Sequence, residues 1–278
     1  MAETARLLLM QPGLRMDDEA IRALFERLAL AAGVEIMAVR AAGYDVEKKA
    51  DSSPVTEADT RAEAVILGGL ERELAGVPHV GEEEISAGRI PEDLGGAFVL
   101  VDPLDGTREF VSGRDEFTVN IALVRDCVPE IGVVYAPARG VAWSGRPGRA
   151  ERFTVSTEGA IEGRRPITVC GPENGRPRIV ASRSHRTPET DDFIARHPGA
   201  EIVSVGSSLK FCLLAEGLAD LYPRFGRTME WDTAAGDAVL RAAGGKTCLV
   251  DGAPLTYGKR DQKDDSDFAN PWFISRVD

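Results

Sequence analysis

The stretch Ala97-Phe-Val-Leu-Val-Asp-Pro-Leu-Asp-Gly-Thr107 joins five apolar residues directly to a segment that contains two aspartates. A short, continuous apolar run of this kind is typical of a strand that is buried on both faces. Pro103 stiffens the segment that follows, and Gly106 permits a sharp bend. We therefore predict a buried strand that delivers the two aspartates to a turn at its end.

Asp102 and Asp105 stand three residues apart in this predicted turn, with the carbonyl group of Leu104 between them. Such a turn can aim both carboxylates and the carbonyl oxygen at one point. Hard oxygen ligands of this sort select Mg²⁺ over a thiolate-binding metal. The backbone N–H groups of Gly106 and Thr107 follow at once, where they could hold a phosphate. Taken alone, however, Asp-Pro and Asp-Gly steps are more often simple turns.

Two other acidic positions also follow apolar residues. Glu82, Glu83 and Glu84 come after Val80-Gly81, at a predicted strand end, although a run of charges by itself is more often a solvated surface. Asp232 follows Trp231 and opens a predicted helix in the N-cap position. Because helix N-termini attract anions, a carboxylate there could both cap the helix and share a metal with a phosphate.

Working outward from these positions, apolar periodicity and turn residues predict a chain in which helices and strands alternate. We expect helices at about 17–40, 59–74, 208–216 and 232–243, and strands at 97–101, 117–124, 131–135, 178–182, 201–205 and 218–225. The segment 155–177 is rich in Gly, Arg and Pro and is the expected boundary between two halves. We thus divide the chain into an N-terminal extension (1–15), an α+β half (16–160) and an α/β half (161–278).

Composition bounds the class of protein. The chain has 278 residues, 43% hydrophobic and 28% charged, which is typical of a soluble globular protein. Its net charge of −12 argues against nucleic-acid binding, and bound cations can reverse the charge locally. No apolar run approaches the roughly eighteen residues of a membrane span. The four cysteines are far apart, which excludes common zinc spacings and favours reduced thiols in a cytoplasmic location.

Three segments resemble, in order and spacing, the signature of the inositol monophosphatase superfamily. They are Gly81-Glu-Glu83, Asp102-Pro-Leu-Asp-Gly-Thr107 and Trp231-Asp-Thr-Ala-Ala-Gly236. A fourth, Ser53-Pro-Val-Thr-Glu-Ala-Asp59, is similar to the upstream motif of that family. The resemblance implies a layered αβαβα sandwich, with the active site between an α+β half and an α/β half.

Within the superfamily, the chain is most similar to the 3′(2′),5′-bisphosphate nucleotidases of bacterial sulfur assimilation. The resemblance is carried by Arg108-Glu109-Phe110, Glu116-Phe-Thr-Val-Asn-Ile-Ala-Leu123, Ser182-Arg-Ser-His185, Gly206-Ser-Ser-Leu-Lys-Phe-Cys212 and Leu221-Tyr-Pro-Arg-Phe225. Departures from close relatives are Gly81 in place of a frequent Ser, Asp237 in place of a frequent His, and the extension 1–15.

This resemblance implies hydrolysis of adenosine 3′,5′-bisphosphate to AMP and phosphate. One alternative keeps the chemistry but changes the substrate to an inositol phosphate or fructose 1,6-bisphosphate. A rival from another class is a non-catalytic regulator that binds metal or nucleotide. The implied partner is a small phosphorylated nucleotide, and the implied protein is a monomer or homodimer in the cytoplasm or at the periphery of the inner membrane.

The resemblance also implies residue roles. Two or three Mg²⁺ ions would be bound by Glu82, Asp102, Asp105, Asp232 and the Leu104 carbonyl, with Lys49 helping to position them. Asp59 and Thr107 would activate the attacking water together with Glu82, and the Gly106 and Thr107 N–H groups would hold the phosphate. Ser207, Lys210, Arg224, His185 and Asp232 would contact the substrate. Independently, four clustered carboxylates cannot all stay ionised without cations between them.

Several substrate contacts have simpler alternatives. Lys210 could be an exposed helix end, Arg224 a surface ion pair and His185 a polar loop residue. For Arg224, a two-pronged guanidinium contact to a second phosphate is the sharper hypothesis.

Overall fold

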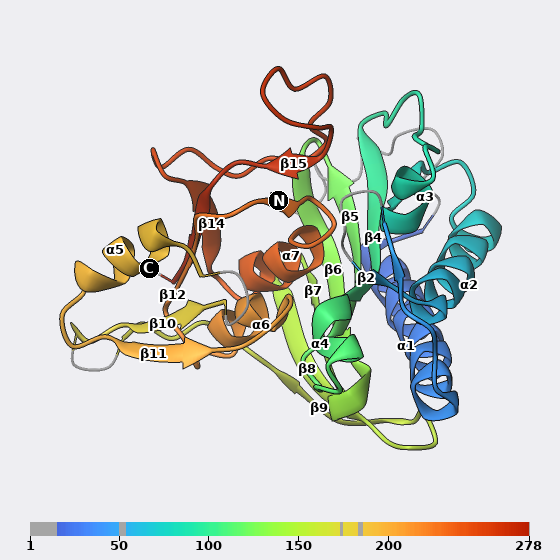
Figure 1. Cartoon of the computed structure of the whole chain (residues 1–278), viewed down its shortest axis with the longest axis horizontal. Helices are drawn as coiled ribbons and strands as arrows, with labels where there is room; N and C mark the ends of the chain where they lie inside the picture. The colour runs from blue at the N-terminus through green and yellow to red at the C-terminus, as the bar shows by residue number, and fades with distance from the viewer. Residues whose placement is uncertain (1–15, 50–53, 173–174, 183–185, 278) are drawn as a thin grey trace, which may run out of the picture.

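A seven-stranded sheet and a five-stranded sheet organise the chain in this computed structural model, which describes residues 16–49, 54–172, 175–182 and 186–277. Helices cover the outer faces of both sheets and fill the space between them (Figure 1). The layers therefore follow the order αβαβα, which confirms the predicted fold class. The extension 1–15, Ser53 and His185 lie outside the described residues.

The seven-stranded sheet has the strand order β3-β4-β5-β6-β7-β8-β9, parallel between β3 and β4 and antiparallel elsewhere. Its strands are β3 (His79–Gly81), β4 (Ala97–Asp105), β5 (Thr118–Arg125), β6 (Val128–Ala136), β7 (Val141–Arg146), β8 (Arg149–Val155) and β9 (Ile161–Pro166). β9 carries this sheet past residue 160.

β4 is buried as predicted but does not end in a turn at Val101. Asp102 pairs with Asn120 and Asp105 pairs with Thr118 of β5, and the register shifts between these two pairs. The expected turn is wrong, because the aspartates lie in an irregular continuation of the strand. A bulge of this kind re-aims side chains at the edge of a site.

Two long helices, α1 (Asp18–Ala42) and α2 (Glu57–Glu73), cover one face of this sheet. The Asp17 side chain caps α1 by accepting the Ala20 N–H, and Thr56 forms a reciprocal capping box with Asp59 at the start of α2. The short strands β1 (Glu47–Lys48) and β2 (Pro54–Val55) pair in the connection between the helices.

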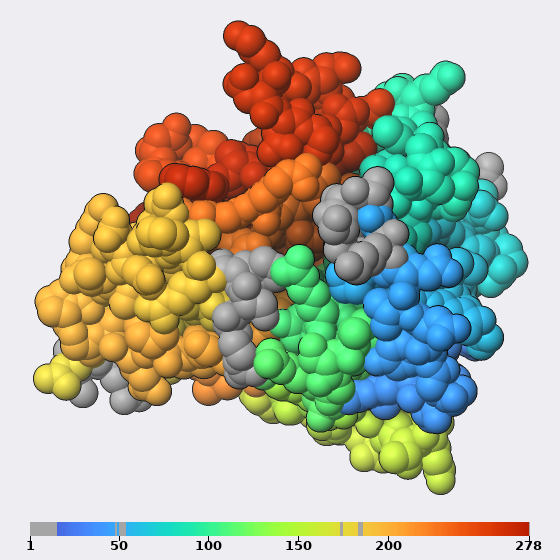
Figure 2. All heavy atoms as spheres, viewed as in Figure 1, coloured from blue at the N-terminus to red at the C-terminus, as the bar shows by residue number. Residues whose placement is uncertain are grey.

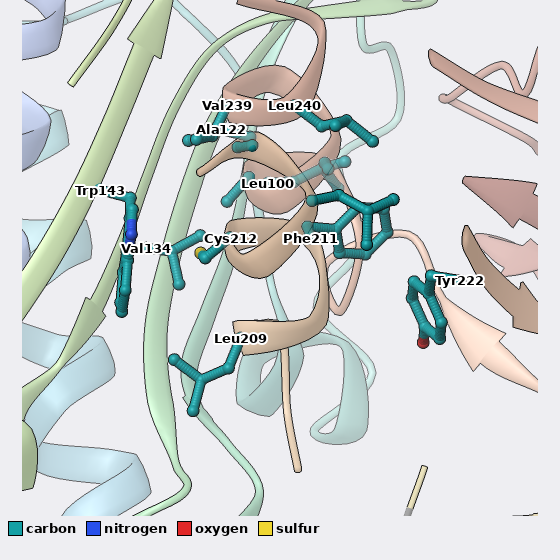
Figure 3. Close-up of a cluster of buried hydrophobic side chains, with 14 of the residues drawn as sticks. Leu100, Ala122, Val134, Trp143, Leu209, Phe211, Cys212, Tyr222, Val239 and Leu240 are labelled. Carbon is teal, nitrogen blue, oxygen red and sulfur yellow. The ribbon is translucent and has the colours of Figure 1, made fainter. Parts of the chain in front are cut away.

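The opposite face packs against α6 (Leu209–Ala215) and α7 (Ala234–Ala242), which separate the two sheets. In Figure 3, Leu209 and Cys212 of α6 point toward Val134 of the first sheet, and Phe211 points toward Tyr222 of the second. α7 approaches the sheet closely because Gly132 has no side chain there: an added Cβ would lie 2.5 Å from the Ala235 carbonyl oxygen.

The second sheet has the order β11-β10-β12-β16-β14, with α5 (Pro188–Ala195) on its outer face. Its strands are β10 (Arg178–Ala181), β11 (Glu201–Ser204), β12 (Leu221–Arg224), β14 (Lys246–Leu249) and β16 (Phe273–Arg276). A small ribbon of β13 (Thr228–Met229) and β15 (Ala269–Asn270) lies beside it, and the short helices are α3 (Glu82–Ser86), α4 (Thr107–Val111) and η2 (Pro137–Arg139).

The segment around α4 lies against the C-terminal end of α1 on the face shown in Figure 2. There the Arg40 guanidinium contacts Asp115 at 2.8 Å and the Gly113 carbonyl oxygen at 3.0 Å. Among the helices of the described ranges, none has the length and apolar character that crossing a bilayer requires.

Candidate active site

A cavity of about 630 Å³ brings together most of the predicted site residues. It is lined by Lys49, Glu82, Asp102, Leu104, Asp105, Gly106, Thr107, Ser207, Lys210, Arg224 and Asp232, among others. The end of β4, the starts of α3 and α4, the start of α6, the end of β12 and the segment before α7 contribute these residues. Asp59 lies directly behind Thr107 and is almost completely buried.

One wall of the cavity, here called the acidic wall, carries the carboxylates of Glu82, Asp102, Asp105 and Asp232. Burial raises the pKa of Asp102 well above its usual range, and the negative charges of Glu82, Asp105 and Asp232 raise it further. Burial together with Asp105 and Glu82 also raises the pKa of Asp232 to about 8. The positive groups nearby therefore do not compensate the negative charge that these carboxylates carry when ionised.

Backbone and hydroxyl donors fix the direction of these carboxylates. Asp105 accepts hydrogen bonds from the Ser208 N–H at 2.6 Å and the Ser208 hydroxyl at 3.0 Å. Asp102 accepts the Leu104 N–H at 3.0 Å. Sequence reasoning missed Ser208, although it lies inside the quoted segment 206–212, because nothing local shows that it faces β4.

Asp232 does not cap α7, so that prediction is wrong. The N-cap residue is Thr233, and the Asp232 carboxylate turns back to accept the Met229 N–H at 2.8 Å. This contact points Asp232 toward the cavity instead of along the helix axis. The residue is therefore free of a helix-capping role and lies beside Asp105, whose charge raises its pKa.

Asp59 and Thr107 meet as the resemblance implied. Asp59 accepts hydrogen bonds from the Thr56 N–H and hydroxyl, both at 2.8 Å, as part of the capping box. Its other oxygen lies 3.1 Å from the Thr107 hydroxyl, which is also 3.1 Å from the Leu104 carbonyl oxygen. The Thr107 proton thus has two acceptors, and one of them is a carboxylate whose pKa burial raises.

Gly106 is required for two reasons. Its φ of +93° lies in the left-handed region, which residues with a side chain rarely adopt. An added Cβ would also lie 3.0 Å from the Glu116 carbonyl oxygen. A residue with a side chain would therefore displace the start of α4, where the Gly106 and Thr107 backbone lines the cavity.

Lys49 closes the acidic wall. Its ammonium group lies 2.6 Å from the carboxylates of both Glu82 and Glu83. Burial lowers the pKa of Lys49, but these two charges raise it by more. Behind them, burial raises the pKa of Glu63 to about 7, against the hydrogen bond that its carboxylate accepts from the Glu83 N–H.

The opposite wall is cationic. Lys210 is 5% exposed, so the exposed helix end considered above is wrong. Its ammonium donates to the Ser207 carbonyl oxygen at 2.5 Å, and burial lowers its pKa to about 8. Arg224 donates to the Arg227 carbonyl oxygen at 3.0 Å.

Two polar atoms on this wall are buried without a hydrogen-bond partner in the described part of the chain: Arg224 Nε and Ser207 Oγ. Ser207 also has a positive φ of +47°, which is uncommon for a residue with a side chain. Buried unsatisfied groups and unusual backbone angles cluster at ligand sites. Both observations favour a polar ligand next to this wall.

The carboxylates fit Mg²⁺ by donor chemistry. Within the described ranges, no three His, Cys, Asp or Glu side chains already converge as a complete ion site. The acidic wall nevertheless offers oxygen donors with uncompensated negative charge, which are the ligands that Mg²⁺ takes from proteins. These residues could therefore hold such ions.

Comparison with known proteins gives consistent results. A sequence model of the inositol monophosphatase family matches residues 17–269. The chain is 43% identical over 251 residues to the 3′(2′),5′-bisphosphate nucleotidase CysQ of Escherichia coli O157:H7, covering 89% of this chain and 96% of that protein. It is 41% identical to CysQ of Salmonella typhimurium over 89% of this chain and 96% of that one.

A solved structure is similar over the same extent. The crystal structure of CysQ from Bacteroides thetaiotaomicron superposes with a TM-score of 0.75 at 36% identity, over 93% of this chain and 97% of that one. The structure of the Thermotoga maritima inositol monophosphatase TM1415 has a TM-score of 0.71 at 24% identity, over 94% of this chain and 92% of that one, and so shares the fold.

Proposed function

The chain belongs to the inositol monophosphatase family, and we propose that it is a Mg²⁺-dependent phosphatase that converts adenosine 3′,5′-bisphosphate to AMP and phosphate. The relatives that are more than 40% identical over most of the chain carry the name 3′(2′),5′-bisphosphate nucleotidase. We also propose two or three ions, bound by Glu82, Asp102, Asp105, Asp232 and the Leu104 carbonyl, in a cytoplasmic monomer or homodimer.

The two oppositely charged walls of the cavity carry this proposal. A bisphosphate nucleotide has one phosphate to be hydrolysed and a second that only needs to be bound. The acidic wall, once neutralised by cations, suits the first phosphate. Lys210 and Arg224 on the other wall suit the second, and the unsatisfied Arg224 Nε offers a charge-assisted hydrogen bond to it. An inositol monophosphate would leave this second wall unused.

The protein's own groups supply the proton transfer. Mg²⁺, when bound, supplies charge neutralisation for the attacked phosphate. Thr107 Oγ1 accepts a proton from the attacking water while its own proton passes to Asp59, 3.1 Å away. The water oxygen bonds to phosphorus as the bond from phosphorus to the ribose 3′-oxygen breaks. That oxygen takes a proton from solvent water, and Asp59 then returns its own proton to solvent. The N–H groups of Gly106 and Thr107 orient the phosphate.

The test is phosphate release from adenosine 3′,5′-bisphosphate, inositol 1-phosphate and fructose 1,6-bisphosphate under identical Mg²⁺ concentrations. We expect the highest kcat/KM with the nucleotide. Faster turnover of inositol phosphate or of the sugar bisphosphate would overturn the substrate assignment, and no turnover of any of them would favour the non-catalytic regulator.

A variant pair tests the cationic wall. Arg224→Met should raise KM for the nucleotide about tenfold or more, because a hydrogen bond to a charged group contributes about 1.5–3 kcal/mol. Arg61→Met is the control: this arginine is not among the residues that line the cavity, contacts Glu57 at 2.6 Å and has a side chain that is 49% exposed. We expect its KM to stay within about twofold of the wild type.

A further inference from the structure

Helix α2 presents two carboxylates on one face. Asp59 and Glu63 are four residues apart, so their side chains project from adjacent turns in the same direction. Asp59 reaches the Thr107 hydroxyl after β4, and Glu63 reaches the Glu83 N–H at 2.9 Å after β3. Because β3 and β4 are parallel neighbours, one helix face contacts both strand ends that form the acidic wall.

The space around Glu63 is shaped for its carboxylate. The side chain is buried, with 4% of the residue exposed. A Cβ added at Gly81 would lie 2.3 Å from Glu63 Oε1, although the φ of Gly81, −99°, is one that any residue adopts. Gly81 therefore lacks a side chain because the Glu63 carboxylate occupies that space, and not because the backbone needs a glycine.

We propose that Glu63 is a positioning residue that holds the start of α3 through the Glu83 N–H and thereby fixes the direction of the Glu82 carboxylate. Lys49 contacts that carboxylate at 2.6 Å from the other side, so Glu82 is held between two supports. Glu63 itself is not among the residues that line the cavity. This role rests on the proposed function, because it matters only if Glu82 binds Mg²⁺.

The first test measures Mg²⁺ binding directly by isothermal titration calorimetry, without nucleotide. Glu63→Ala removes the acceptor of the Glu83 N–H, and we expect Mg²⁺ affinity to fall about tenfold or more, as for other groups that orient a metal ligand. Glu63→Gln keeps a carbonyl acceptor and should stay within about twofold of the wild type. Wild-type affinity in folded Glu63→Ala would overturn the proposal.

A second variant tests the same contact from the other side. Gly81→Ala should push the Glu63 carboxylate off the Glu83 N–H and weaken Mg²⁺ binding to a similar degree. In the Glu63→Ala background the same substitution should have little further effect, because the contact is already lost. Losses that simply multiply in the double variant would contradict the proposal. Gly81→Ala alone serves if Glu63→Ala folds poorly, since it leaves Glu63 in place: wild-type Mg²⁺ affinity in folded Gly81→Ala would then overturn the proposal.

Turnover separates this role from that of Asp59. Glu63→Ala should regain most of its kcat at saturating Mg²⁺, whereas Asp59→Asn should keep its Mg²⁺ affinity and lose turnover. Weakened Mg²⁺ binding in Glu63→Ala, in a protein that hydrolyses none of the three phosphates, would overturn the proposed function and leave the positioning role intact. Unchanged Mg²⁺ binding with full nucleotide turnover would overturn the positioning role alone.

Discussion

Two regions of the molecule bury acidic side chains, and they treat the charge in opposite ways. Beneath α1, the carboxylates of Glu26 and Glu151 contact the guanidinium groups of Arg22 and Arg164. Burial acts to raise the pKa of Glu151, but hydrogen bonds from arginines lower it overall. In the active site, burial and neighbouring carboxylates raise the pKa of Asp102 well above its usual range.

The difference shows which acidic cluster is complete in the protein alone. Breaking a buried ion pair leaves a charge without compensation, so the cluster beneath α1 contributes to folding. The active-site carboxylates repel one another and oppose folding until a cation neutralises them, which is the usual cost of a functional site. The two clusters should therefore respond in opposite directions to the loss of one carboxylate.

The largest expected effect is on turnover. Asp102→Asn should lower kcat/KM by about 10³-fold or more, since metal chemistry contributes several kcal/mol to the transition state. In metal-free buffer the same variant should melt about 2 °C higher than the wild type, because asparagine has no ionised form for burial and the neighbouring carboxylates to disfavour. Assays with Mg²⁺ and calorimetry with a chelator check the two results. A variant that is inactive and also less stable would contradict the comparison.

The next effect is on stability beneath α1. Glu26→Ala leaves Arg22 and Arg164 short of an acceptor and should cost about 3 kcal/mol of unfolding free energy in urea, with kcat unchanged for the folded enzyme. The neighbouring Arg27 is the matched control. It pairs with Glu73 at the surface, with side chains 57% and 42% exposed, so Arg27→Ala should cost less than about 1 kcal/mol. Equal losses in both variants would remove the distinction between the clusters.

Added Mg²⁺ should stabilise the folded protein only through the active-site carboxylates. At about 100 times its Kd, a ligand that binds the folded state alone adds about 2.7 kcal/mol. We expect this gain in the wild type and in Glu26→Ala, and a much smaller gain in Asp102→Asn. Urea unfolding with and without Mg²⁺ measures it. An equal gain in all three proteins would place the ion elsewhere.

Local patterns were enough to predict the buried strand β4 and its two aspartates, and the family resemblance implied the layers and most of the residues that line the cavity. They did not predict how the polar groups are held, because those contacts depend on the local backbone conformation or join distant segments. Asp232 turns to the Met229 N–H in place of capping α7, and Ser208 contacts Asp105 across 103 residues. Glu63 accepts a hydrogen bond from a backbone N–H group 20 residues away. Every residue except proline has this group, so the sequence gives no sign of the contact.

The smallest effect concerns Glu19, at the rim of the cluster beneath α1. Its carboxylate contacts the guanidinium groups of Arg22 and Arg146, and the Arg22 hydrogen bond is the main reason that the pKa of Glu19 falls from 4.5 to about 2. Because the folded-state pKa is lowered, the contribution of Glu19 to the free energy of unfolding is complete above pH 4.5 and is lost as the pH falls toward 2. Because the side chain is 49% exposed, solvent screens the pairs, and Glu19→Gln should cost less than about 1 kcal/mol at pH 6.

Urea unfolding of the wild type and Glu19→Gln from pH 6 to pH 3 should show this difference in unfolding free energy shrinking steadily. A difference that stays constant or grows at low pH would mean that Glu19 stabilises the helix by packing, and that the arginines at this rim are neutralised by other groups.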